Sequence, residues 1–126
     1  MLVKNLLKQT DQLLTFNSTL DKKYESQLLL SNLLNKNIIE IIVNHELKIT
    51  EKKKKKFLKK IYFRNLGKPL SKIIGVKDFY SRQFFVNSFT LDPRPESELI
   101  VDCVKKLKKI EKNNLKILDL GTGSGC

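Results

Sequence analysis

The sequence is poor in residues that build covalent or metal-bound scaffolds. Its 126 residues include two cysteines, one histidine and no tryptophan. Cys103, Cys126 and a single histidine provide neither a disulfide framework nor the ligand spacing of a metal site. We therefore expect a protein of a reducing compartment that binds no metal.

Long apolar runs are absent as well. The longest apolar stretch, residues 38–43, is interrupted by Glu40 and is far shorter than the roughly 20 residues that span a bilayer. Residues 1–10 lack the uninterrupted apolar core of a secretory signal. We expect a cytoplasmic protein that does not associate with membranes.

Acidic residues are scarce, since 13 Asp and Glu stand against 25 Lys and Arg and give a net charge of +12. This excess favours anionic partners such as RNA, although a solvated lysine-rich surface has the same composition. The five lysines from Lys52 to Lys56 fit a phosphate-contacting patch or a solvated helix face. Because no arginine or exposed aromatic residue interrupts the run, nucleic acid is not the expected partner. Whether the run contacts RNA stays open.

Apolar residues recur at helical spacing throughout residues 1–66, which predicts an N-terminal helical bundle. Asp21 and Thr50 are suitable N-caps for the second and fourth helices. The β-branched residues of the third segment also allow a strand, but its helical neighbours favour a helix. The predicted helices cover residues 2–14, 22–34, 38–47 and 51–65.

The pattern changes at Gly67. Residues 79–86 alternate aromatic and polar side chains around Ser81, Arg82 and Gln83, which predicts a β-hairpin. Pro95 is well placed as the first residue of a helix, whose apolar face would bury Cys103. An apolar strand over residues 116–120 follows. The expected fold class is mainly α: a helical domain (1–66), a β-hairpin linker (67–92), and the first helix and strand of a Rossmann-like α/β domain (93–126).

Three glycines at alternate positions follow this strand, with Asp119 two residues before the first. Glycine permits positive φ and lets a backbone approach a ligand closely. The dinucleotide fingerprint Gly-x-Gly-x-x-Gly would require glycine at position 126, where this sequence has cysteine. The observed Asp-x-Gly-x-Gly-x-Gly spacing is instead that of the first motif of S-adenosylmethionine-dependent methyltransferases. A plain tight turn is the alternative.

Several further sequence motifs, taken in their order and spacing along the chain, point to one family of such methyltransferases. The sequence resembles the peptide chain release factor glutamine methyltransferases, the HemK/PrmC family, with Glu25 and Arg64 matching its helical N-terminal domain. The pieces that carry the resemblance are Gly67-x-Pro69-Leu70, Ile73-x-Gly75, Phe79-Tyr80, Phe84-x-Val86, Leu91-x-Pro93-Arg94-Pro95-Glu96-x-Glu98 and the segment from Leu118 to Gly125.

The resemblance implies a reaction and its sites. A methyl group would move from S-adenosyl-L-methionine to the side-chain amide nitrogen of the glutamine in the release factor's Gly-Gly-Gln tripeptide. The helical domain would dock the release factor. By position, the cofactor-binding residues would be Asp119, Gly121, Thr122, Gly123, Ser124 and Gly125, and the substrate-pocket segment would contain Arg94, Pro95 and Glu96.

No catalytic residue is assigned, because the family's Asn-Pro-Pro-Tyr substrate clamp does not occur in these 126 residues. An amide nitrogen is a poor nucleophile and needs such a clamp to orient it. We therefore expect no methyl transfer by this chain alone. The alternative function is a non-catalytic helical module that binds a release factor or another translation partner. We also expect residues 1–66 to fold alone and the segment from about Leu99 to be loosely held or aggregation-prone.

Overall fold

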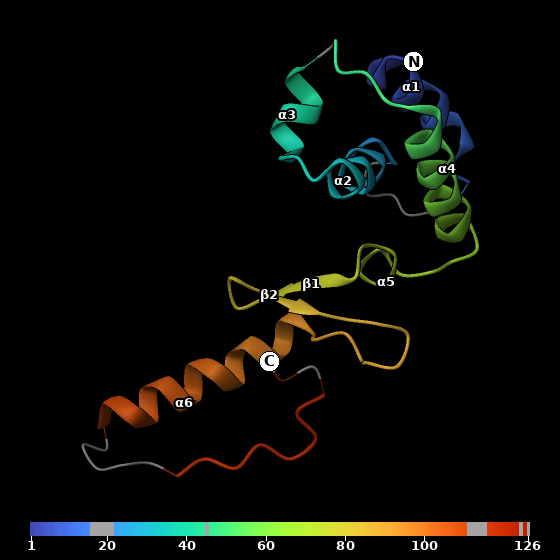
Figure 1. The fold of residues 1–126 in the computed structure, drawn as a ribbon. Helices are drawn as coiled ribbons and strands as arrows, with labels where there is room; N and C mark the ends of the chain where they lie inside the picture. Colours follow the sequence, from blue (N-terminus) through green and yellow to red (C-terminus); the bar gives the residue numbers. More distant parts are fainter. Residues whose placement is uncertain (16–21, 45, 111–115, 124, 126) are drawn as a thin grey trace. The chain divides into compact units, whose positions relative to one another are not determined.

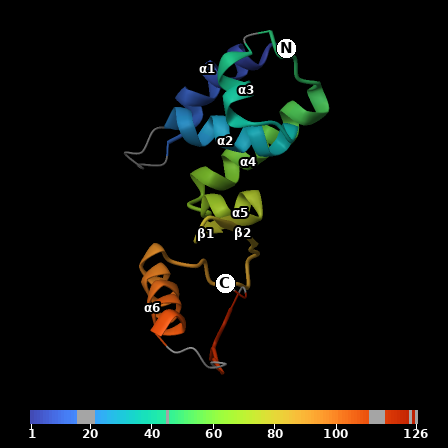
Figure 2. The same ribbon diagram turned by 90° about the vertical axis from the view of Figure 1, so that its left-hand side faces the viewer.

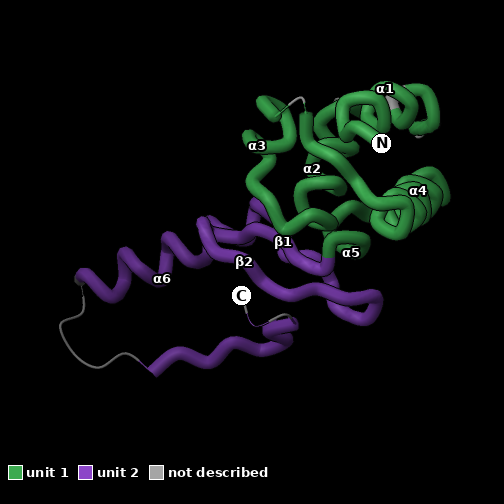
Figure 3. The backbone as a smooth tube through the Cα atoms, turned by 45° about the horizontal axis from the view of Figure 1, so that its top comes forward, with its two compact units in different colours: residues 1–74 green, residues 75–126 purple. Residues whose placement is uncertain are grey.

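The computed structural model describes residues 1–15, 22–44, 46–110, 116–123 and 125 (Figure 1). The chain divides into two compact units, Met1–Ile74 and Gly75–Cys126 (Figure 3). The described part of the chain is mainly helical, with one two-stranded sheet. No described helix combines the length and apolar character that a bilayer crossing requires.

In the first unit, helix α2 (Lys22–Leu34) is central. It contacts α1 (Val3–Leu13), α3 (Ile38–Val43), α4 (Glu51–Asn65) and α5 (Leu70–Ile74) (Figures 1 and 2). The helical bundle predicted from apolar spacing is therefore confirmed. Its core consists of nine buried apolar side chains: Val3, Leu6, Leu14, Leu29, Leu30, Ile41, Ile49, Phe57 and Ile61.

Two small polar residues, Thr10 and Ser26, are fully buried in this unit. Each hydroxyl donates to a carbonyl oxygen three residues earlier, Thr10 Oγ1 to Leu7 and Ser26 Oγ to Lys23, both at 2.9 Å. The hydroxyls are thus satisfied within their own helices, α1 and α2. They add no unpaired polar group to the core.

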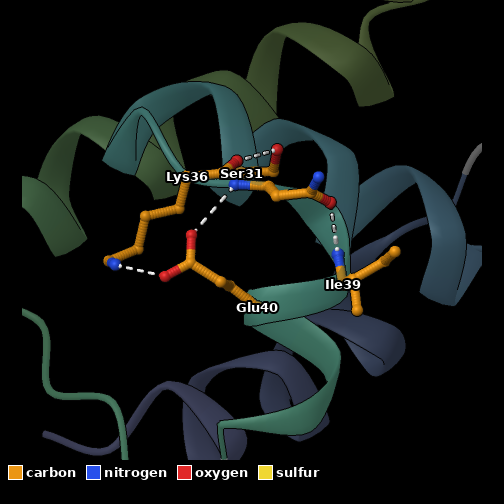
Figure 4. A network of polar contacts seen from close by, with 5 residues as sticks. Ser31, Lys36, Ile39 and Glu40 are labelled. Carbon is orange, nitrogen blue, oxygen red and sulfur yellow. Dashed lines mark hydrogen bonds and ion pairs between the residues drawn. The ribbon is translucent and has the colours of Figure 1, made fainter.

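Helix α3 begins with a capping box (Figure 4). Asn37 Oδ1 accepts from the Ile39 backbone N–H at 2.9 Å, and Glu40 Oε2 accepts from the Asn37 N–H at 3.2 Å. Lys36 Nζ lies 2.8 Å from the other Glu40 oxygen, and Ser31 Oγ donates to the Lys36 carbonyl at 2.7 Å. This network fixes the turn between α2 and α3.

Helix α3 ends at Val43, earlier than the predicted residue 47. The residues that follow pair with the N-terminus: the Val3 N–H donates to the Leu47 carbonyl at 2.8 Å, and the Ile49 N–H donates to Met1 at 3.0 Å. The Leu47 carbonyl accepts from this distant segment instead of continuing the helix, so the helix prediction was wrong for Asn44, Glu46 and Leu47. Residue 45 of that prediction lies outside the described residues.

Helix α4 begins where the sequence predicts, with Thr50 Oγ1 accepting from the Lys53 N–H at 3.4 Å. The Asp21 cap proposed for α2 lies outside the described residues. Of the lysine run, Lys54 pairs with Glu51 at 3.9 Å and the other four are exposed. After α4 the chain turns at Gly67, whose φ of 83° favours glycine.

The second unit opens with the predicted hairpin, formed by β1 (Val76–Phe79) and β2 (Arg82–Phe85). Its turn lies at Tyr80 and Ser81, slightly earlier than the sequence indicates, and both residues have positive φ, 49° and 58°. Two consecutive positive φ values match the twist of the flanking strands in a two-residue hairpin. The hairpin is confirmed with its turn displaced.

Helix α6 (Glu98–Ile110) follows a 3-10 turn, η1 (Pro95–Ser97), so Pro95 begins the helical segment as predicted. The prediction that Cys103 is buried was wrong, because its side chain is exposed. The strand predicted over residues 116–120 is not formed either, and Leu118 and Leu120 are 80% and 83% exposed. A strand needs a hydrogen-bonded neighbour, and no described strand pairs with this segment.

Candidate functional site

The glycine segment has a backbone that only glycine adopts easily. Gly121, Gly123 and Gly125 have φ values of 80°, 60° and 79°. The Gly125 N–H donates to the Thr122 carbonyl at 3.0 Å, which closes a turn. Asp119 and Thr122 are exposed, and Ser124 lies outside the described residues.

Space around these glycines is open. A Cβ built on Gly121 or Gly125 would meet nothing within 4 Å, and one on Gly123 would lie 3.8 Å from the Gly121 carbonyl oxygen. The glycines are therefore required by their positive φ rather than by crowding inside the described chain. An uncovered backbone of this kind is accessible to a ligand.

The Pro-Arg-Pro-Glu segment has a different structure. Arg94 is the extended residue before η1, with φ −98° and ψ 142°, and Pro95 follows as the first residue of the turn. Fixed φ and a missing N–H suit proline to that position. Glu96 lies in the first turn, where a carboxylate is favoured by the helix dipole.

The structure does not bring the two predicted site segments together. Arg94, Pro95 and Glu96 are exposed, as are the described residues of the glycine segment. Across the described residues, no hydrogen bond or ion pair joins residues 94–96 to residues 119–125. Their roles in a common pocket stay predictions.

A polar network that joins the hairpin turn to α6 was missed by the sequence analysis. The Tyr80 N–H donates to Glu98 Oε1 at 2.8 Å, and the Tyr80 hydroxyl donates to Asp102 Oδ1 at 2.7 Å. Lys105 Nζ donates to the Tyr80 hydroxyl at 2.9 Å and lies 4.1 Å from the ring centroid. The only sequence signal is the spacing of Glu98, Asp102 and Lys105, which puts them on one helix face.

In the first unit, Glu25 and Arg64, which match the family's helical N-terminal domain, form an ion pair with an Nε to Oε2 distance of 2.7 Å. Arg64 is 8% exposed and also donates from Nη1 to the Lys68 carbonyl at 3.4 Å. The hydrogen bond to Glu25 raises the pKa of Arg64 above its ordinary value. The pair joins α2 to α4 and is therefore a structural element of the helical unit.

Comparison with known proteins decides the family. Residues 5–75, more than half of the chain, match the family model described as the PrmC N-terminal domain. The chain belongs to the PrmC family of release factor glutamine methyltransferases. The matched range contains both Glu25 and Arg64.

Methyltransferases of several bacteria are similar to most of the chain. A release factor glutamine methyltransferase of Buchnera aphidicola subsp. Schizaphis graminum is 44% identical over 82% of this chain and 37% of its own length. One from Leptospira interrogans is 35% identical over 98% of this chain and 43% of its own. A bifunctional methyltransferase of Rickettsia felis is 32% identical over 98% of this chain and 28% of its own. The chain thus spans about two fifths of the two release factor glutamine methyltransferases.

Proposed function

We propose that this chain takes part in the S-adenosyl-L-methionine-dependent methylation of the Gly-Gly-Gln glutamine of a peptide chain release factor. The observation that carries the proposal is the family match over residues 5–75, followed in the same chain by the Asp119–Gly125 spacing. In this proposal the first unit docks the release factor in the cytoplasm. The residues from Pro93 onward begin a Rossmann-like methyltransferase domain.

The glycine segment fits a cofactor-side loop. S-adenosyl-L-methionine supplies an activated methyl group when it is bound. The positive φ values at Gly121, Gly123 and Gly125 and the open space beside two of them leave the backbone free to lie against the cofactor. Asp119, Thr122 and Ser124 complete the proposed loop, and Arg94, Pro95 and Glu96 are proposed to border the substrate pocket.

Catalysis needs more than this loop. The glutamine amide nitrogen has a delocalised lone pair and must be aligned with the methyl group by oriented acceptors. The Asn-Pro-Pro-Tyr sequence that would supply them does not occur here. The chain alone is therefore expected to bind the release factor without methylating it.

The alternative function, a non-catalytic module that binds a release factor or another translation partner, is favoured by one observation. The buried core cluster of the described chain lies wholly in the first unit, whereas the described residues from 116 onward are all exposed. The proposed docking unit therefore has a packed core, whereas no described strand pairs with the proposed methyl-donor loop.

One experiment separates the two functions. The purified 126-residue chain is incubated with release factor and methyl-labelled cofactor, while a pull-down with and without cofactor measures docking. We expect retention of the release factor and no label above a control in which the Gly-Gly-Gln glutamine is replaced by alanine. Failure to retain the release factor would refute the docking function. Glutamine-dependent labelling would refute the need for the Asn-Pro-Pro-Tyr clamp.

A further inference from the structure

The first unit contains a groove of about 410 Å³ between α2, α4 and α5. Its apolar side chains are Leu33 from α2, Phe63 from α4 and Ile73 from α5. All three are half-buried, so they present apolar surface to the groove without filling it. A volume of this order accommodates one or two side chains of a partner rather than a long ligand.

Lysines surround this apolar floor, and we call the whole feature the lysine groove. Lys56, Lys59 and Lys68 line it and are exposed. None of the three forms an ion pair within the described chain, and no aspartate or glutamate is among the lining residues. Lys56, Lys59 and Lys68 therefore add positive charge to the apolar surface of the groove.

The ring of Phe63 is contacted by two of these lysines. Lys59 Nζ lies 5.8 Å and Lys68 Nζ 5.4 Å from its centroid. Contacts of this kind attract each ammonium group to the ring although the two cations repel each other. An anionic group near these ammonium groups would relieve the repulsion.

A further lysine, Lys60, lies at the edge of the same groove and is held by neutral partners. Its Nζ donates to Asn32 Oδ1 at 2.7 Å and to the Ile73 carbonyl at 3.3 Å. Partial burial lowers the pKa of Lys60 below its ordinary value. Neutral acceptors orient the ammonium group but leave its charge uncompensated, so this side of the groove also favours an anion.

We propose that the lysine groove binds an acidic segment of a protein partner, with one apolar side chain between Leu33, Phe63 and Ile73 and flanking carboxylates on the lysines. Charge complementarity selects the carboxylates, and the apolar floor selects the side chain. RNA fits less well, because no arginine lines the groove and no exposed aromatic ring offers a stacking surface there. The identification of that partner as a release factor rests on the function proposed above.

A peptide test examines the groove without any release factor. The probe is a short fluorescent peptide with one leucine flanked by glutamates, compared with the same peptide carrying serine for leucine, and binding is measured by anisotropy. The groove variant is K56Q/K59Q/K68Q. The matched control is K52Q/K53Q/K55Q, which removes the same charge from exposed positions that do not line the groove.

We expect the groove variant to lose about tenfold in affinity for the leucine peptide, the combined effect of three exposed ion pairs. The control variant should lose less than about twofold. Phe63→Ser should remove the preference for leucine over serine. An equal loss of peptide affinity in both triple variants would show a general charge effect and overturn the proposal. Binding of single-stranded RNA of equal charge more tightly than the leucine peptide would also overturn it.

A second arm uses the release factor itself. Wild-type chain should retain it, and the groove variant should retain it about tenfold more weakly. If the wild type does not bind the release factor but the peptide results hold, the proposed function fails and the groove stands. If all variants bind the release factor equally, docking stands and the groove as its site is overturned.

Discussion

Arg64 of α4 and Glu25 of α2 are joined by two parallel hydrogen bonds across 39 positions of the sequence, Nε to Oε2 at 2.7 Å and Nη2 to Oε1 at 2.8 Å. Both side chains are largely buried, 9% and 13% exposed. A guanidinium matches a carboxylate with two fixed donors, whereas a lysine ammonium does not. The pair thus fixes the relative orientation of the two helices.

Replacing Arg64 by methionine tests this pair. The substitution leaves the Glu25 carboxylate largely buried without the guanidinium, so the free energy of unfolding should fall by about 3 kcal/mol in urea denaturation. Lys53→Met, at an exposed position of the same helix, should change it by less than about 0.5 kcal/mol. Arg64→Lys should recover only part of the loss.

The double variant E25L/R64M shows whether the lost stability of Arg64→Met comes from the ion pair or from packing of the arginine stem. Because it removes both charges, its cost should be smaller than the sum of the two single variants. Additive costs would mean that the ion pair contributes little and that packing of the arginine stem accounts for the effect.

Local sequence signals predicted much of the first unit. Periodic apolar residues identify helices because one face must be buried, and Thr50 marks the start of α4 because its hydroxyl can accept a first-turn N–H. Glu25 and Arg64 were each noticed separately. Their pairing depends on how α2 packs on α4, which no local pattern encodes.

The wrong predictions for Cys103, for residues 116–120 and for the end of α3 have a common physical origin. A periodic pattern shows which face of an element is apolar, not whether anything covers that face. The apolar face of α6 and the segment 116–120 illustrate this, since Cys103, Leu118 and Leu120 are exposed. The early end of α3 is likewise set by pairing with the distant N-terminus, through the bridge between Leu2 and Lys48.

Asn65, the last residue of α4, is predicted to stabilise the end of α1. Its Nδ2 donates to the Leu13 carbonyl at 2.8 Å, and its Oδ1 accepts from the Thr15 N–H at 3.1 Å. Asn65→Ala removes both bonds and should cost about 1 kcal/mol in thermal or urea unfolding. Asn65→Asp keeps the acceptor but lacks the donor, so its change in the free energy of unfolding should differ from that of Asn65→Ala. Equal stability of wild type and Asn65→Ala would contradict this role.

The capping box of α3 predicts a pH dependence. The hydrogen bond from Lys36, followed by that from the Asn37 backbone, lowers the pKa of Glu40 below its ordinary value. The pKa of Glu40 is therefore lower in the folded state than in the unfolded state. The stabilisation that ionised Glu40 gives the fold is complete above the unfolded-state pKa of about 4.3, and it is lost as the pH falls through the folded-state pKa.

The test compares urea midpoints between about pH 6 and pH 3 in the wild type and in Glu40→Gln. Glutamine can still accept from the Asn37 N–H but does not titrate, so the variant should lose less stability on acidification. Lys36→Met should also flatten the profile, because it removes the largest cause of the shift. Identical profiles in all three proteins would exclude a contribution from Glu40.

The Tyr80 hydroxyl is predicted to hold the hairpin turn against α6. It donates to Asp102 and accepts from Lys105, and both bonds are lost in Tyr80→Phe while the aromatic ring remains. Because the site is only partly buried, the local opening free energy should fall by about 1 kcal/mol. Hydrogen exchange of the β1, β2 and α6 amides measures this change.

Tyr62→Phe is the control, since Tyr62 is an exposed tyrosine of the other unit. It should leave exchange in β1, β2 and α6 unchanged. If Tyr80→Phe also leaves it unchanged, the ring contact with Lys105 and the Tyr80 N–H bond to Glu98 suffice to hold the turn. If exchange accelerates in the hairpin and in α6 together, the hydroxyl links the two elements, since a local effect on the turn would not reach the helix.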